Sequence, residues 1–249
     1  MLGIERNING SCSVKLNFRL YEGKFIQRLN RFLAEIDING QKVLAHLPNS
    51  GRMLTVLSFN CKAFLTKKES AKRRSKYTMF AVQRNSIPII VDATFANKLT
   101  KSLIDKGLFP PFRKYRVLKE NILKNGSRID FLLGRNGQRF YLEVKSVSYV
   151  IDGIAMFPDA PTSRGKKQIK TLIQCVREGL NAGILFTVQR PDAKKLRPCH
   201  EIDPKFSELI VKAIKNEVKV FTQTLFFKPE KSAVEIIFSK PEFWVSKIK

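Results

Sequence analysis

Short runs of β-forming residues, separated by turn signals, fill the first third of the chain. Asn39-Gly40 is a preferred pair for a hairpin turn, and a loop follows at residues 48–51. The expected strands are residues 14–20, 24–29, 31–38, 42–47, 53–57, 63–66, 77–83 and 87–91. Many short strands without a long helix predict an all-β barrel or sandwich over residues 1–92.

The pattern changes after Asp92, where helical and strand-like segments alternate. Helices are expected at residues 94–106, 165–178 and 204–216, the last beginning behind Asp203 as N-cap with Pro204 in the first position. The expected strands are residues 115–123, 128–133, 140–150, 184–189, 218–227 and 233–238. This alternation predicts an α/β domain over residues 93–249.

Composition narrows the class of protein. Hydrophobic residues make up 43% of the 249 residues, as expected of a globular chain, and no apolar run approaches the ~20 residues that span a bilayer. The first residues lack the apolar stretch of a signal peptide. The four cysteines have no CxxC spacing. We therefore expect a cytoplasmic protein with reduced thiols and no membrane or zinc site.

The net charge of the chain indicates what kind of partner it binds. Lys and Arg number 46 against 21 Asp and Glu, a formal net charge of +25, and the excess lies on both sides of residue 92. Such a chain repels itself unless a polyanion or salt offsets the charge. We expect the partner to be a nucleic acid. The alternatives are a generic basic surface or contact with anionic lipid, although no basic amphipathic anchor helix is seen.

A hairpin in the second domain brings acidic residues together. Asn136-Gly137 is the preferred pair for a two-residue type I′ turn. If these two residues form the loop, Arg135 pairs with Gln138, and Asp130 lies directly opposite Glu143 with Cβ atoms about 5 Å apart. The turn therefore predicts a pair of facing carboxylates.

Lys145 joins this pair, because it lies two residues after Glu143 on the same face of the strand. Facing carboxylates repel each other, and a divalent cation such as Mg²⁺ or Mn²⁺ removes the conflict. We therefore expect Asp130 and Glu143 to be metal ligands and, with Lys145, the catalytic residues, Lys145 orienting a water or neutralising a phosphoryl group. The alternative is that Lys145 simply pairs with both carboxylates on a solvent-facing strand.

Basic residues in both predicted domains are candidates for phosphate contacts. Cations crowd the start of the helix predicted at residues 165–178, where the helix dipole disfavours them unless an anion is present. A second group lies in and around the basic run at residues 67–77, and the alternative for both groups is a solvated basic surface. The expected nucleic-acid contacts are Arg52, Lys67, Lys68, Arg73, Arg74, Arg128, Arg164, Lys166 and Lys167. Asp159 either caps the next helix or approaches the metal.

Several stretches together resemble the sugar fermentation stimulation protein A family. They are Arg31-Phe-Leu-Ala-Glu, Ala45-His-Leu-Pro-Asn-Ser-Gly-Arg-Met53, Ser127-Arg-Ile-Asp-Phe-Leu-Leu133, Tyr141-Leu-Glu-Val-Lys-Ser-Val147, Met156-Phe-Pro-Asp-Ala-Pro-Thr-Ser-Arg-Gly165 and Phe186-Thr-Val-Gln-Arg190. The resemblance implies an N-terminal OB-like barrel followed by an α/β domain similar to PD-(D/E)XK nucleases. It implies that Asp130 is the first acid of that motif and that Glu143-Val-Lys145 is its (D/E)XK element. It also implies that the nucleic-acid partner is DNA, which we expect to be bound without strong sequence specificity.

Two functions remain open at this stage. The first is a DNA-binding protein with a metal-dependent phosphodiesterase site. The second is a non-catalytic DNA-binding or regulatory protein, linked by the resemblance to sugar metabolism, that retains a nuclease fold. The nuclease superfamily often adds an acid from a preceding helix, and the sequence offers only Asp105 there. The oligomeric state is open, with a homodimer among the options.

Overall fold

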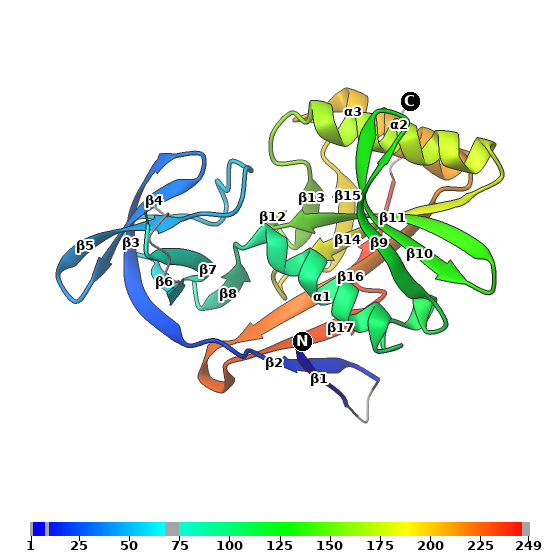
Figure 1. Ribbon diagram of the computed structural model, residues 1–249. Coiled ribbons are helices and arrows are strands. Elements are labelled where there is room, and N and C mark those ends of the chain that lie inside the picture. The colour runs from blue at the N-terminus through cyan, green and yellow to red at the C-terminus, as the bar shows by residue number, and fades with distance from the viewer. Residues whose placement is uncertain (1, 8–9, 68–74, 246–249) are drawn as a thin grey trace.

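The protein has two lobes, each built around a β-sheet (Figure 1). The computed structural model describes residues 2–7, 10–67 and 75–245. In the smaller lobe, five strands close into a barrel in the order β5-β4-β3-β6-β7, with β5 returning to β7 and β8 extending the sheet. Their bounds are β3 (Leu20–Asn30), β4 (Leu33–Ile38), β5 (Gln41–His46), β6 (Lys62–Lys67), β7 (Tyr77–Arg84) and β8 (Ile87–Ile90).

The barrel forms largely where the hydrophobic pattern predicts strands. Asn39 and Gly40 both have positive φ, 51° and 84°, as the β4–β5 turn requires, and the Gly40 N–H donates to the Asp37 carboxylate. Two expected strands are wrong. The one at residues 14–20 is broken, because residues 16–19 connect two separate strands. Residues 53–57 form turns, in which the N–H groups of Val56 and Leu57 both donate to the Met53 carbonyl. An apolar run of five residues is too short to distinguish a buried turn from a strand.

The larger lobe is an α/β domain around an eight-stranded sheet of order β1-β2-β17-β16-β14-β11-β10-β9. Neighbours β11, β14 and β16 run parallel, and the outer strands run antiparallel. The strands are β1 (Gly3–Arg6), β2 (Cys12–Lys15), β9 (Arg116–Lys124), β10 (Ser127–Arg135), β11 (Gln138–Val147), β14 (Asn181–Val188), β16 (Lys219–Lys228) and β17 (Ala233–Phe238). The architecture confirms the predicted fold class of a barrel followed by an α/β domain.

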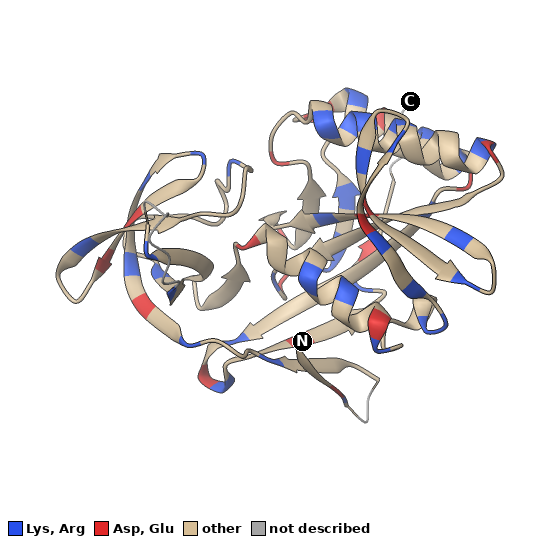
Figure 2. Ribbon diagram, viewed as in Figure 1, with Lys and Arg blue, Asp and Glu red and all other residues tan. Residues whose placement is uncertain are grey.

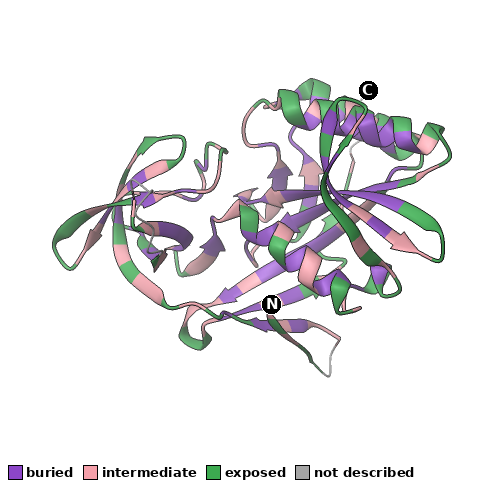
Figure 3. Cartoon of the chain, in the orientation of Figure 1, coloured by how far each residue is buried: buried purple, intermediate pink, exposed green. Residues whose placement is uncertain are grey.

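Helices cover the two faces of this sheet. Helix α1 (Ala93–Asp105) packs on one face, and α2 (Ser163–Arg177) and α3 (Pro204–Lys215) pack on the other, with their inner surfaces buried (Figure 3). Asp203 caps α3 by accepting from the Phe206 N–H, as the sequence predicts. Short 3₁₀ turns lie at residues 110–112 and 229–231. No helix in the described ranges is both long and apolar enough to cross a bilayer.

A small four-stranded sheet, absent from the sequence-based expectation, lies between the large sheet and the barrel. Its order is β12-β13-β15-β18, with bounds β12 (Tyr149–Ile151), β13 (Ile154–Phe157), β15 (Lys195–Pro198) and β18 (Glu242–Phe243). These strands contain two to four residues each, which is too short for a period-of-two pattern to stand out.

The first strands of the chain belong to the second lobe. β2 pairs antiparallel with β17, and β1 pairs with β2 at the edge of the large sheet. Cys12 and Val14 are buried there against Val234. The expectation that residues 1–92 form one barrel unit is therefore wrong for residues 3–15. Alternation within a strand predicts a buried face but does not say which sheet edge will cover it.

The two lobes share an aromatic core. Phe80 of the barrel packs edge-on against Phe95 of α1 and Phe227 of β16, with ring centroids 5.2 Å apart in both pairs. Phe64 of the barrel also packs against Phe227, at 5.3 Å. Since one hydrophobic cluster includes residues of both lobes, they should fold and unfold as one unit.

Polar contacts fix the loop after β5 against the second lobe. The Met53 N–H donates to Asp159, and the Arg190 guanidinium donates to the Thr55 carbonyl. Arg28 of β3 holds the same loop by donating to the Gly51 carbonyl at 2.6 Å. Both expectations for Asp159 are therefore wrong. It neither caps α2, whose N-cap is Thr162, nor lies with the acidic pair, and it joins the lobes.

Gly51→Ala is expected to lower the free energy of unfolding by about 1–3 kcal/mol, because the new methyl group overpacks this interface. A Cβ at Gly51 would lie 2.3 Å from one Asp159 carboxylate oxygen and 2.5 Å from the other. Urea denaturation followed by circular dichroism measures the change. Ser50→Ala, at the exposed neighbouring position, serves as the control and should stay within about 0.5 kcal/mol of wild type. Equal stability of the two variants would contradict the close contact.

Candidate functional site

The β10–β11 hairpin has the register that its turn predicts. Asn136 and Gly137 have φ of 47° and 78°, and the ladder runs from Arg135↔Gln138 to Phe131↔Leu142. This confirms the predicted pairing up to the two carboxylates. Beyond Phe131 the ladder stops, and side chains take the place of backbone partners.

Asp130 and Glu143 each accept a hydrogen bond from the other strand. The Asp130 N–H donates to Glu143 Oε2 at 3.3 Å, and the Val144 N–H donates to Asp130 Oδ2 at 2.8 Å. Both residues are buried, with 8% and 2% of their surfaces exposed. The two carboxylates thus lie at one site inside the protein and not on a solvent-facing strand.

Strand β10 is distorted at Asp130. Ile129 packs in the core beneath α2, whereas Phe131 packs in the core beneath α1. Residues two apart in a regular strand point to the same face, so the chain twists between them. On the neighbouring strand, Ile129 pairs with Ile122 and Phe131 pairs with Glu120, which leaves Asn121, with a φ of 52°, opposite Asp130. Such irregularities often lie next to functional sites.

Lys145 and Gln168 complete the buried cluster. Lys145 Nζ donates to Glu143 Oε1 at 2.5 Å and to Gln168 Oε1 at 2.6 Å, and Gln168 Nε2 donates to the Arg128 carbonyl at 2.8 Å. Lys145 and Gln168 are 9% and 1% exposed. Sequence reasoning missed Gln168. The sequence does contain an indication of this role: Gln168 is a polar residue on the apolar stripe of α2, four positions before Leu172.

The acidic pair is under electrostatic strain. The pKa of the Glu143 carboxyl is raised to about 7. Burial is the largest cause, the Lys145 ammonium opposes it, the Asp130 charge adds to it, and the Arg164 guanidinium opposes it more weakly. One ammonium group and a more distant guanidinium therefore do not fully compensate for two buried carboxylates.

The residues present fit a small divalent cation. They offer hard carboxylate oxygens, and Asp130 Oδ1 has no hydrogen-bond partner in the described part of the chain. Among residues 2–7, 10–67 and 75–245, no group of three or more His, Cys, Asp or Glu side chains could hold a metal. A cation here would therefore complete its shell with water or ligand oxygens, as Mg²⁺ commonly does.

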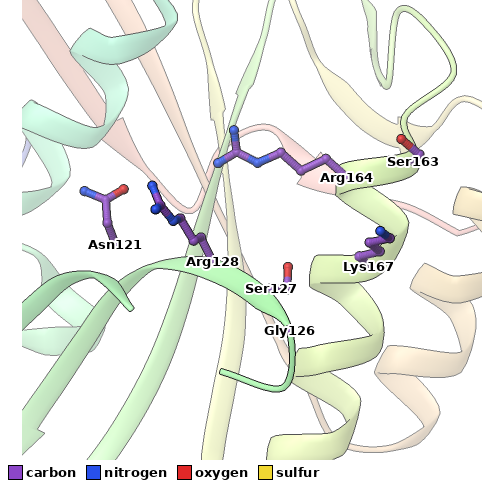
Figure 4. A pocket seen from close by; sticks show the side chains of 7 residues that line it. All are labelled: Asn121, Gly126, Ser127, Arg128, Ser163, Arg164 and Lys167. Atoms are coloured by element: carbon purple, nitrogen blue, oxygen red, sulfur yellow. The ribbon is translucent and has the colours of Figure 1, made fainter. Parts of the chain in front are cut away.

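A pocket of about 490 Å³ opens beside this cluster, between the β9–β10 hairpin and the start of α2 (Figure 4). Three of the predicted phosphate-binding residues, Arg128, Arg164 and Lys167, line it. Lys166, predicted with them, points elsewhere, because it forms an ion pair with Asp203 at 2.6 Å. Basic residues are also spread over α2, α3 and β9 (Figure 2).

The remaining predicted contacts belong to the barrel lobe. Arg52 is exposed in the loop that docks against Asp159, and Lys67 is exposed at the end of β6. Lys68, Arg73 and Arg74 lie outside the described residues. The pocket therefore gathers three of the nine predicted cations.

Comparison with known proteins identifies the family. The family model described as the sugar fermentation stimulation protein RE domain matches residues 94–231, and that of the SfsA N-terminal OB domain matches residues 26–91. The chain belongs to the sugar fermentation stimulation protein family. This confirms the resemblance noted in the sequence and the assignment of the barrel as an OB domain.

Relatives in this family match most of this chain and most of their own length. A sugar fermentation stimulation protein homolog of Caldanaerobacter subterraneus subsp. tengcongensis is 36% identical, over 82% of this chain and 90% of the relative. One from Clostridium tetani is 35% identical, over 84% and 90%. The solved structure of Pyrococcus furiosus SfsA in complex with Ca²⁺ is 27% identical, with a TM-score of 0.84 over 93% of this chain and 97% of that one.

Proposed function

We propose that this protein binds DNA and cleaves its phosphodiester bonds with a divalent cation held by Asp130 and Glu143. The observation that carries the proposal is the buried cluster of two carboxylates and Lys145, which adjoins a pocket lined by cations. A fold gains little from facing carboxylates unless something positive lies between them. A phosphate-binding protein of net charge +25 accounts for the cluster and its surroundings together.

Mg²⁺ or Mn²⁺ is the proposed cation, since both favour oxygen ligands. The structure of the Pyrococcus furiosus relative in complex with Ca²⁺ supports a divalent site in a protein of similar fold. When bound, such a cation stabilises negative charge on a phosphoryl oxygen and acidifies a coordinated water.

Lys145 has the second role in the proposal. Its ammonium group is held between Glu143 and Gln168, and Gln168 is anchored by the Arg128 carbonyl. A fixed ammonium can donate to a water or to a phosphoryl oxygen without reorganising during the reaction. Gln168 is a positioning residue, because it contacts Lys145 and the strand that carries Asp130.

A DNA-binding protein without turnover is the second candidate. It is favoured by the pairing of Lys145 with Glu143, which can neutralise one carboxylate without a cation. The extra acid offered by the sequence, Asp105, is exposed at the end of α1 and accepts from the Val117 N–H. A small-molecule phosphohydrolase is disfavoured, because a small substrate does not require such a basic surface.

The test incubates the purified protein with plasmid and with short single- and double-stranded DNA in Mg²⁺ or Mn²⁺. Glu143→Ala and Lys145→Ala should each reduce cleavage by about 10²-fold or more, whereas Glu208→Ala, at an exposed position on α3, should not. DNA binding in EDTA should persist in all variants and weaken steeply with salt.

The outcomes separate the candidates. Cleavage that survives both site substitutions contradicts the proposed site. A wild-type protein that binds every DNA tested but cleaves none supports the second candidate. Affinity that does not depend on salt would contradict both.

A further inference from the structure

The pocket beside the acidic cluster has an unusual lining. Its walls come from β9, the turn after it, the start of β10 and the first turns of α2, and none of the lining residues is acidic, aromatic or aliphatic (Figure 4). The lining residues are Asn121, Gly126, Ser127, Arg128, Ser163, Arg164 and Lys167. Ligand pockets for organic molecules are mostly apolar with a few polar groups, and this one is the reverse.

Its three cations have no direct counter-ion in the described part of the chain, although the Arg164 charge lowers the pKa of the nearby Glu143 carboxyl. In the described part of the chain, the side chains of Arg128, Arg164 and Lys167 form no ion pair and donate no hydrogen bond to a protein group. Cations nearby do find partners: Lys166 pairs with Asp203, and Lys124 pairs with Glu178. Three unpaired charges around one hollow repel each other unless an anion lies among them.

The arginines and the small polar residues suit a phosphate. Arg128 and Arg164 approach the hollow from opposite elements, β10 and α2 (Figure 4). Guanidinium groups bind phosphate oxygens through paired hydrogen bonds, and serine hydroxyls add single ones. Without an aromatic ring in the lining, a base has no surface on which to stack.

The pocket is connected to the acidic cluster through two residues. Gln168 bonds both Lys145 and the Arg128 carbonyl, and Asn121 lies opposite Asp130 on the neighbouring strand. A ligand bound in the pocket therefore lies next to a ligand bound at Asp130, and the two sites do not overlap.

We propose that this pocket binds a second phosphate of the nucleic acid, next to the one at the acidic cluster, and recognises it without contacting a base. The inference rests on the proposed function for the identity of the ligand, and it assigns the phosphate to Arg128, Arg164 and Lys167. Two sources share this chemistry: a terminal phosphate and an internal backbone phosphate.

The first test uses inorganic phosphate alone and the full chain without metal. Phosphate titrated into the wild type should give saturable binding in a ³¹P NMR titration, and the triple variant Arg128→Gln, Arg164→Gln, Lys167→Gln should lose it. Lys170→Gln is the matched control, since this exposed lysine of α2 does not line the pocket. All four substitutions are at exposed positions, so thermal unfolding should confirm that the variants remain folded.

The second test measures DNA affinity in EDTA. Each arginine substitution should weaken binding about tenfold, as the loss of a charge-assisted hydrogen bond does, and Lys170→Gln should weaken it less than about twofold. The loss should be the same for oligonucleotides of different base sequence. A loss confined to oligonucleotides with a 5′- or 3′-phosphate assigns the pocket to a strand end, and an equal loss with circular DNA assigns it to the backbone.

Two results overturn the inference. One is unchanged phosphate binding in the triple variant, and the other is an equal loss of DNA affinity from Lys170→Gln and from the pocket substitutions. Failure of the proposed cleavage is a separate outcome: phosphate binding that depends on the three cations stands even if no DNA is cut.

Discussion

The metal-free Glu143→Gln variant is expected to be more stable than the wild type at pH 8, although it loses a proposed metal ligand. Burial raises the pKa of the Glu143 carboxyl to about 7 from an ordinary value of 4.5. The folded protein therefore binds this proton more tightly than the unfolded chain does. The stabilisation that comes from this bound proton is fully present below pH 4.5 and is lost as the pH rises through about 7. Glutamine carries no charge at any of these pH values and avoids the loss.

Thermal unfolding in EDTA from pH 5 to pH 8.5 measures this effect. The melting temperature of the wild type should fall across this range, and that of Glu143→Gln should fall less. At pH 8, the free energy of unfolding of Glu143→Gln should exceed that of the wild type by about 1–3 kcal/mol. Glu208→Gln, an exposed carboxylate without an ion pair among the described residues, should leave the profile unchanged. A variant less stable than wild type at pH 8 would show that the pairing with Lys145 outweighs burial.

Addition of Mn²⁺ extends the same experiment. A cation that binds only the folded state raises its stability, so the wild type should gain in melting temperature. Glu143→Gln should gain little, because it keeps only one of the two carboxylates. Equal gains in both proteins would place the cation elsewhere.

Phe80→Ala is expected to lower the free energy of unfolding by about 3–5 kcal/mol, the usual cost of removing a buried phenylalanine. Phe80 is 2% exposed, and its ring contacts Phe18, Phe95 and Phe227 at centroid distances of 5.2 Å. These partners lie outside the barrel strands, so the cavity would open at the junction of the lobes.

Urea denaturation followed by circular dichroism tests this prediction. The wild type and Phe80→Ala should each unfold in one transition, with the midpoint of the variant shifted to lower urea. Phe59→Ala is the control, because that ring is 72% exposed and its loss should change stability by less than about 0.5 kcal/mol. Two transitions, of which only one shifts, would mean that the lobes unfold independently.

Much of the candidate site could be read from local sequence. The Asn136-Gly137 turn fixes the hairpin register, because its left-handed residues allow a two-residue loop and little else. That register brings Asp130 opposite Glu143. The sequence did not predict that the carboxylates of Asp130 and Glu143 would replace backbone groups as hydrogen-bond acceptors between the two strands. This arrangement depends on the twist of β10 that places Ile129 and Phe131 in different cores.

Other parts of the site required the packing of distant segments. Gln168 follows Lys145 by 23 residues, and they meet because α2 buries its apolar stripe on the face that carries Lys145. Lys166 looks equivalent to Lys167 in the sequence. In α2, Lys166 points toward Asp203 and Lys167 points toward the pocket, because consecutive helical residues point about 100° apart.

By itself, the sequence determined features that depend on neighbouring residues: the hairpin turns, the Asp203 cap of α3, the apolar faces of the helices and the overall charge. These follow from backbone conformation and side-chain chemistry within a few positions. Only the tertiary structure decided which faces meet. It placed β1 and β2 on the second lobe, moved Asp159 to the barrel loop, and left three cations around one hollow. An apolar or charged face requires a partner, but many partners satisfy it locally, and only the packing of the whole chain selects one.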